Sequence, residues 1–230
     1  MSDPVLIGSL IKILFVCIII TAAYIISARN LLSIVSVYAV QSFALVIIAL
    51  LLFWLEESPV LLAIAAITFA SKVLIIPYFI ATIQEKIRIK RDIQFHFLSP
   101  TSSLLLSMGL MLLVYIVLSR VMEGAAEREN LFFFGAVLGI SLMLMGMMVT
   151  FSRKRALTKV LGFLSMENGV LLFGLFVTEL PFIIEFLIVI DLIILVLLTT
   201  ILTVGLDSTL EDYQKRLHRF HLWEDTGEVR

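Results

Sequence analysis

Seven long apolar stretches divide this chain, and they restrict its fold more than any other feature of the sequence. An α-helix needs about 20 mostly apolar residues to cross the hydrocarbon core of a bilayer. The stretches that meet this length are residues 5–27, 31–54, 60–82, 102–120, 131–152, 156–178 and 182–205. Hydrophobic residues make up 61% of the chain, whereas soluble domains contain about 45–50%. The sequence therefore predicts an all-α integral membrane protein with seven transmembrane helices.

The positions of the lysines and arginines predict how these helices are oriented. Cytoplasmic loops of membrane proteins retain an excess of basic residues. If the N-terminus lies outside, thirteen of the 17 basic residues fall on the inner side, and only Arg120 and Arg128 fall in outer loops. The other two, Lys12 and Lys72, lie inside apolar stretches. We therefore expect a multi-pass protein of the cell inner (cytoplasmic) membrane, with the N-terminus outside and the C-terminus in the cytoplasm.

Two halves of the chain are weakly similar to each other. RNLLSIVSVYAVQSFALVIIAL (29–50) aligns without gaps with RALTKVLGFLSMENGVLLFGLF (155–176), which places Gln41 opposite Glu167. With a shorter loop, Lys72 of the third stretch corresponds to Asp191 of the seventh. Three helices, one spare helix and three further helices give both triplets the same orientation, so we expect a 3+1+3 parallel repeat.

The repeat predicts four parts of the chain. Residues 1–84 form a first three-helix unit, 85–122 a cytoplasmic loop and linker helix, 123–205 a second three-helix unit, and 206–230 a cytoplasmic tail. Apolar residues recur in the tail at helical spacing, which is typical of an amphipathic helix that lies on a membrane surface or against a partner.

Three ionisable residues lie near the middle of apolar stretches. Asp191 stands alone in FLIVIDLIILVLL (186–198), and Glu167 and Lys72 are equally deep, with Glu167 about 16 Å from the inner end of its stretch at 1.5 Å per residue. A charge at the centre of a transmembrane helix costs roughly 2.5–3.5 kcal/mol on insertion scales. Glu185 lies within one turn of the outer face, where water can reach it.

These residues have three possible roles on sequence grounds. Lys72 could form a structural ion pair with Glu167 or Asp191. Alternatively, the three side chains could form a proton relay or ion path, together with Gln41 and Glu185, because ionisable groups inside membranes commonly mark such paths. The third possibility is pairing with another subunit.

Small residues predict which helices approach closely. Two stretches carry glycines or serine on one face, and such stripes allow close helix contact in membranes. The sets are Gly135, Gly139 and Gly146, and Gly162, Ser165 and Gly169. Glu167 lies about 140° around its helix from Gly162, so it should face a different neighbour. Pro77, five residues after Lys72, either kinks its helix beside the cation or is simply tolerated.

Four segments together resemble component E of hydrogenase-4-type, group 4 membrane-bound [NiFe] hydrogenases. They are YAVQS (38–42), KVLIIP (72–77), GFLSMENG (162–169) and the run that contains Pro181, Glu185 and Asp191. The likeness extends along nearly the whole chain. That family is related to the three-helix K-type subunit of respiratory complex I, which the unit 123–205 resembles.

The resemblance implies a non-redox subunit of the membrane arm of an energy-converting complex. Glu167 and Asp191 would take the places of the two buried glutamates of the K-type subunit, while the first triplet holds Gln41 and Lys72 there. In complex I the first glutamate follows a glycine by two residues, whereas Glu167 follows Gly162 by five. Partners would be other antiporter-like and complex I-like membrane subunits and a soluble hydrogenase arm. The nickel–iron site and iron–sulfur clusters would belong to those partners, often coupled to formate oxidation, and this chain itself would bind no cofactor or metal.

Two alternatives remain open from the sequence. A stand-alone seven-helix transporter of small solutes, of the SWEET type, has the same 3+1+3 plan. Such transporters use prolines in their core helices as hinges, and here only Pro77 lies mid-span. A purely structural scaffold subunit with no ion path is the other alternative.

Overall fold

A computed structural model of the chain describes residues 4–28, 30–87, 99–121, 130–153 and 156–177, and residues 190, 191, 193, 194, 196 and 200. Within these residues the structure is almost entirely helical, and six helical spans are long and apolar enough to cross a membrane. They coincide with the first six predicted stretches, which confirms a multi-pass membrane architecture. The seventh stretch, 182–205, and the tail lie largely outside the described residues. The seventh span, the repeat and the orientation therefore stay predictions.

The first two spans form an antiparallel pair. Helix α1 runs over Pro4–Ser27 and α2 over Leu31–Glu56. At the end of α2, Glu57 adopts a left-handed conformation with φ of 52°, and its N–H donates to the carbonyl of Phe53. Such a residue closes a helix by satisfying one of its last carbonyls. Pro59 then begins the next helix, a position where its missing N–H costs nothing.

The third span is not a continuous α-helix. It consists of α3 (Pro59–Thr68), a π-helical segment η1 (Phe69–Ile75) and α4 (Ile76–Ile87). Pro77 lies just after η1, cannot donate a hydrogen bond, and sterically opposes the carbonyl four residues earlier. A wider π-helical turn is one way for a helix to absorb such a defect. Of the two expectations for Pro77, local distortion beside Lys72 is the one observed.

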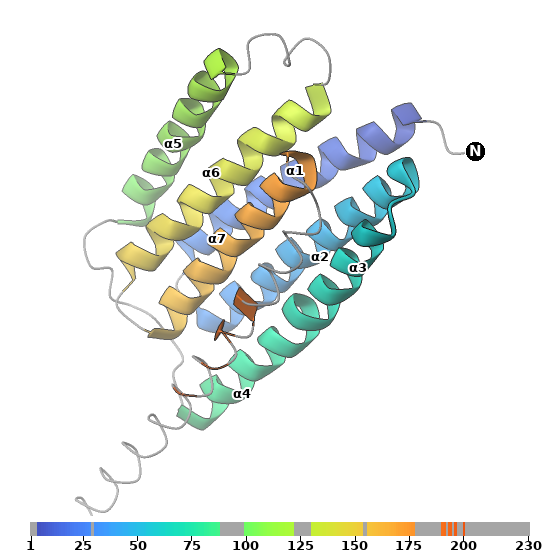
Figure 1. Cartoon of the computed structure of the whole chain (residues 1–230). Helices are drawn as coiled ribbons and strands as arrows, with labels where there is room; N and C mark the ends of the chain where they lie inside the picture. The colour runs from blue at the N-terminus through green and yellow to red at the C-terminus, as the bar shows by residue number, and fades with distance from the viewer. Residues whose placement is uncertain are drawn as a thin grey trace, which may run out of the picture.

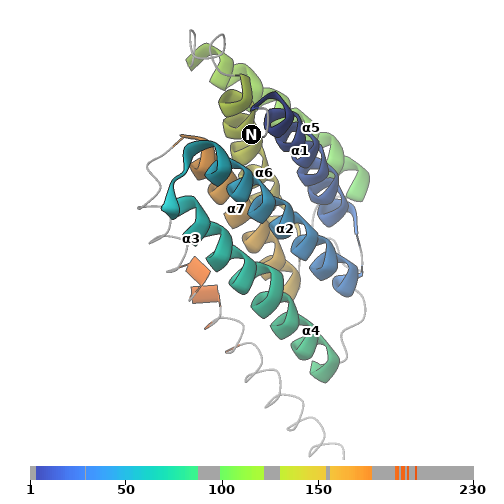
Figure 2. The ribbon, with the colours of Figure 1, turned by 90° about the vertical axis from the view of Figure 1, so that its right-hand side faces the viewer.

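Helices α5 (Pro100–Val121), α6 (Asn130–Ser152) and α7 (Ala156–Val177) complete the described bundle. Figures 1 and 2 show α6 and α7 side by side through the middle of the bundle, and α5 at its edge against α1 and α6. Within the apolar 18-residue part of α7, 72% of the residues are buried inside the bundle, whereas the corresponding share in α5 is only 17%. Helix α7 is therefore the central element, and α5 presents most of its surface outward.

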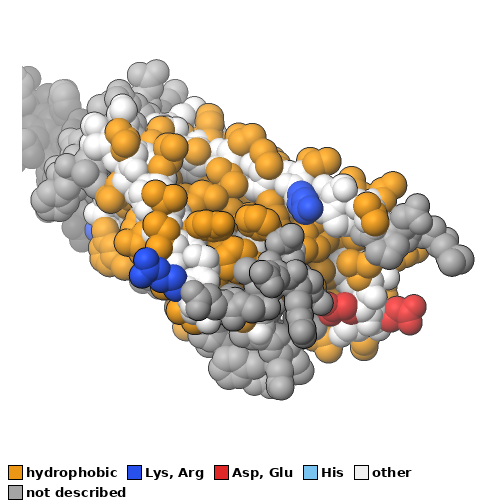
Figure 3. Space-filling view, turned by 90° about the horizontal axis from the view of Figure 1, so that it is seen from above, with side chains coloured by type: hydrophobic (Ala, Val, Ile, Leu, Met, Phe, Trp, Pro, Cys, Tyr) orange, Lys and Arg blue, Asp and Glu red, His pale blue; other side chains and the backbone are white. Residues whose placement is uncertain are grey.

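Apolar side chains fill the inside of the bundle and also cover its outside. One cluster of buried residues joins α1, α2, α3, α6 and α7. Figure 3 shows hydrophobic side chains over most of the described part of one face, with charged groups few and scattered. An apolar exterior of this extent is expected where the solvent is lipid, because each helix must be apolar all round.

Candidate functional site

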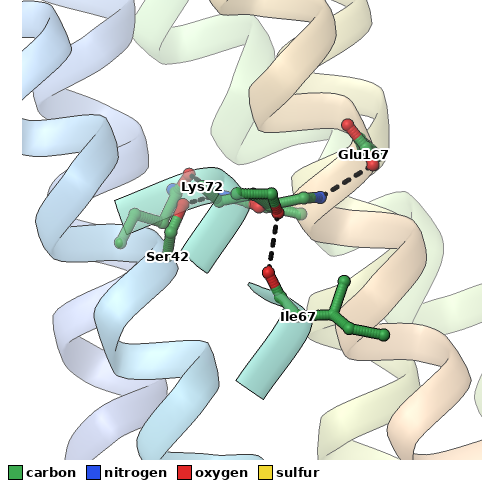
Figure 4. A network of polar contacts seen from close by, with 7 residues as sticks. Ser42, Ile67, Lys72 and Glu167 are labelled. Atoms are coloured by element: carbon green, nitrogen blue, oxygen red, sulfur yellow. Dashed lines mark hydrogen bonds and ion pairs between the residues drawn. The ribbon is translucent and has the colours of Figure 1, made fainter. Parts of the chain in front are cut away.

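The deepest ionisable residues of α7 and η1 form an ion pair. Nζ of Lys72 lies 2.9 Å from Oε1 of Glu167, and the two side chains are 0% and 2% exposed. Figure 4 shows the lysine side chain extending from the π-helical segment toward the carboxylate on α7. Of the two partners expected for Lys72, the observed one is Glu167.

Asn168, the residue after Glu167, links this pair to α2. Its Oδ1 accepts a long hydrogen bond of 3.5 Å from Nζ of Lys72, so the ammonium is held between a carboxylate and an amide. Its Nδ2 donates to Oγ of Ser42 at 3.0 Å and to Oε1 of Gln41 at 3.2 Å. The amide is completely buried, and it serves as the junction between the charged pair and the polar residues of α2.

Gln41 extends the network to α1. Its Oε1 also accepts a hydrogen bond from Oγ of Ser165 at 3.3 Å, and its Nε2 lies 3.4 Å from Oγ1 of Thr21. Thr21 in turn donates to the carbonyl of Ile18. A buried polar cluster therefore runs across the bundle from α1 through α2 and α7 to η1. We define this polar cluster as Thr21, Gln41, Ser42, Lys72, Ser165, Glu167, Asn168 and Asp191.

Asp191 joins the polar cluster without a hydrogen-bond donor among the described residues. Its carboxylate is close enough to Glu167 and to the Tyr38 hydroxyl for electrostatic interaction. Both of its oxygens are inaccessible to solvent, and neither accepts a hydrogen bond from a described residue. The polar cluster thus contains two carboxylic acids for one lysine, an imbalance that a simple structural pair would not have.

The sequence prediction found the charged members of this site and Gln41, but it did not assign Thr21, Ser42 or Asn168 to the site. Four predicted residues, Gln41, Lys72, Glu167 and Asp191, are brought together. Glu185 lies outside the described residues. The missed junction is Asn168, and the available signal was that this amide directly follows Glu167 near the middle of a predicted span.

One prediction about Ser165 needs correction. The sequence predicts that it shares one close-packing face with Gly162 and Gly169, but its hydroxyl faces Gln41 on α2. At 100° per residue it stands about 60° from Gly162, on the flank between the two faces. The rest of that prediction is confirmed, because Gly162 and Gly169 face α6 and Glu167 faces η1.

Arg153, one of the thirteen basic residues expected on the inner side, is buried at the end of α6, with 2% of its surface exposed. Its Nη2 donates to the carbonyls of Ile25, Ile26 and Ala28 at 3.3, 3.0 and 2.7 Å. The last carbonyls of a helix lack partners within the helix and favour a cation. Arg153 therefore fastens the end of α6 to the end of α1.

Comparison with known proteins adds no relative. Neither protein-family models nor curated proteins nor solved structures give a match to this chain. Within the described ranges, no three His, Cys, Asp or Glu side chains come together in a way that could hold a metal ion. The polar cluster combines two acids and one amine with five uncharged side chains that donate or accept hydrogen bonds.

Proposed function

We propose that this chain is a non-redox membrane-arm subunit of an energy-converting, membrane-bound [NiFe] hydrogenase complex, of the hydrogenase-4 component E type. In this proposal Glu167, Asp191 and Lys72 contribute to proton or ion translocation. The translocation role is supported by the polar cluster, which brings two acids and one amine together inside the bundle, and the type of complex is supported by the sequence resemblance alone. Buried ionisable residues in membrane spans are costly and are kept mostly where they serve transport.

The charges of the polar cluster suit a relay. With both acids ionised and Lys72 protonated, the three side chains sum to one negative charge. One added proton makes them neutral while an ion pair is retained, so the cluster can gain or lose a charge without leaving Lys72 unpaired. Gln41, Ser42 and Asn168 extend the path sideways through hydrogen bonds, and Glu185 would lead from it toward the outer face.

The proposed partners follow from the same assignment. Antiporter-like and complex I-like subunits would lie beside this chain in the cell inner membrane, with its N-terminus outside. A soluble hydrogenase arm on the cytoplasmic side would carry the nickel–iron site and the iron–sulfur clusters and would perform the redox chemistry. Proton or ion movement through this chain would then be driven by conformational or electrostatic changes in those partners.

A purely structural scaffold is the second candidate, and one observation favours it. Lys72 and Glu167 are in direct contact and are both buried, as an inert pair between two helices would be. The scaffold role accounts for Lys72 and Glu167 but leaves Asp191 unexplained, because Asp191 adds a second acid where one lysine is already paired.

Conservative variants of the intact complex separate relay from scaffold. Glu167→Gln and Asp191→Asn keep the shape of each side chain and remove its charge. We expect both variants to assemble and to retain dye-linked hydrogenase activity, with proton transport into vesicles reduced at least tenfold. Glu56→Gln, at the exposed end of α2, is the matched control and should leave transport unchanged.

Other outcomes would count against the proposal. Normal hydrogen-coupled proton transport in both variants would remove the relay and leave the scaffold. A chain that purifies alone in mild detergent and carries a small solute into liposomes would instead indicate the stand-alone transporter.

A further inference from the structure

A groove on the outside of the bundle lies away from the polar cluster. It runs between α1, α5 and α6 and has a volume of about 570 Å³, within the range of about 300–1,000 Å³ in which small-molecule sites fall. Its walls include Ile19 of α1, Met108, Leu112 and Tyr115 of α5, and Phe134 of α6. Lys12 of α1 is the one charged side chain among its described lining residues.

Helix α5 is the least buried of the six described spans, and the groove follows its side toward α1 and α6. Leu112 and Met108 are exposed on α5. Apart from Lys12, the described residues that line the groove are apolar or aromatic side chains of these three helices.

The groove is polarised along the direction of the helices. Lys12 is seven residues from Val5, where its span begins, and Tyr115 is six residues from the end of α5, which places both about 10 Å from the same end of the bundle. Ile19 and Met108 lie about 20 Å from that end by the same measure. One end of the groove therefore has a cation and a phenol, and its deeper part is apolar.

Lys12 has no partner to neutralise its charge within the described part of the chain. It is exposed on the surface of α1, at a depth from which a lysine stem can carry its ammonium toward the interface. The Tyr115 ring is fixed beside it by an edge-to-face contact with Phe133, with the ring centroids 5.8 Å apart. A ligand that matches these features has an anionic head and a long hydrocarbon tail.

We propose that this groove binds an anionic phospholipid of the leaflet at the end where α1 begins, with one acyl chain between α1, α5 and α6 and the phosphate on Lys12. The charge of Lys12 selects for a net negative headgroup, and the apolar walls hold the chain. This site does not depend on the proposed function, since it shares no residue with the polar cluster.

Binding of defined phospholipids to the purified full-length chain tests this inference. The probes are phosphatidylglycerol and phosphatidylcholine with identical acyl chains, added to delipidated protein in mild detergent and counted by native mass spectrometry. The unmodified protein should retain phosphatidylglycerol in preference to phosphatidylcholine. Lys12→Gln should weaken phosphatidylglycerol binding about fivefold, because the attraction of one lysine to an anionic lipid surface changes the affinity by about that factor. Lys12→Arg keeps the charge and should preserve binding.

Two further variants make the result specific to the groove. Leu112→Trp fills the groove while leaving Lys12 in place, and it should reduce retention of both lipids. Lys159→Gln removes an exposed lysine on α7 that does not line the groove, and it should change neither.

Three results would overturn the inference. They are equal retention of the two lipids by the unmodified protein, unchanged phosphatidylglycerol binding in Lys12→Gln, and loss of a co-purifying membrane protein in Lys12→Gln with lipid retention unaltered. The last result would assign the groove to a partner helix that carries an acid.

Discussion

The two sides of α7 hold their neighbours in different ways. Toward α6, α7 presents Gly162 and Gly169, and their backbone lies against α6 residues at Thr150 and Met143. Toward α2 and η1, it presents Ser165, Glu167 and Asn168, which reach across by hydrogen bonds and an ion pair. We call these the glycine seam and the polar face. Both solve the same problem, because lipid provides no hydrophobic drive for helices to associate.

The glycine seam and the polar face differ in how much movement they tolerate. A glycine seam gains its energy from many small van der Waals contacts at fixed distance, so it tolerates little movement. The polar face consists of few contacts, each of which depends on the position of one side chain, and its ion pair also depends on the protonation of Glu167 and Lys72. Helix α7 is therefore packed tightly against α6 on one side and holds ionisable side chains on the other.

The largest effect is expected at the ion pair. Lys72→Met leaves Glu167 buried without its cation, and breaking a buried pair in this way costs about 3–5 kcal/mol. Thermal unfolding of the purified protein in detergent measures the loss. The double variant Lys72→Met with Glu167→Leu should recover most of the stability, because apolar residues can replace a buried pair. If the double variant is no more stable than the single one, charge is not what the polar face depends on.

A somewhat smaller effect is expected in the glycine seam. In Gly146→Leu the new Cβ would meet the backbone of Met166 on α7, so the two helices must separate. Overpacking typically costs 1–3 kcal/mol, and we expect a loss of stability of about 3 kcal/mol here. Folded yield and thermal unfolding report the change. Gly109→Leu is the matched control, since nothing lies within 4 Å of its Cβ position. Equal effects of the two substitutions would show that helix propensity, and not the seam, is being measured.

Loss of Asn168, the junction of the polar face, should lower stability less than the two substitutions above. Asn168→Ala removes the partner of Lys72, Ser42 and Gln41 at once, and leaving buried polar groups unsatisfied costs about 1–3 kcal/mol. We expect a stability loss of that size, together with reduced proton transport in the assembled complex. Unchanged stability would mean that Ser42 and Gln41 find other partners.

The smallest effect is expected at the edge of the polar face. Ser165→Ala removes one donor to Gln41, which still accepts from Asn168. Hydrogen bonds between transmembrane helices contribute about 0.6 kcal/mol on average, so the unfolding temperature should fall only slightly. A loss comparable with that of Asn168→Ala would place the junction at Ser165 instead.

The fold was more predictable from sequence than the contacts of the site. Hydrophobicity and length defined six spans whose ends agree with the observed helices to within a few residues. The side of α7 that carries Glu167 followed from helical periodicity alone. Pro77 indicated that the third span could be distorted. It did not predict the π-helical form, because the missing N–H of a proline can be accommodated by a kink, a bulge or a water.

The sequence alone predicted that the chain crosses a membrane, that glycines form a close-packing face on α6 and on α7, and that Glu167, Lys72 and Asp191 lie deep in apolar stretches. It did so because the bilayer imposes a fixed length and a fixed polarity on every helix. Only the tertiary structure decided that Lys72 meets Glu167, that Asn168 joins them to Gln41, and that Arg153 closes the end of α1. The physical reason is that a periodic pattern gives the direction of a side chain around its own helix, whereas its partner depends on which helix is packed there and at what height.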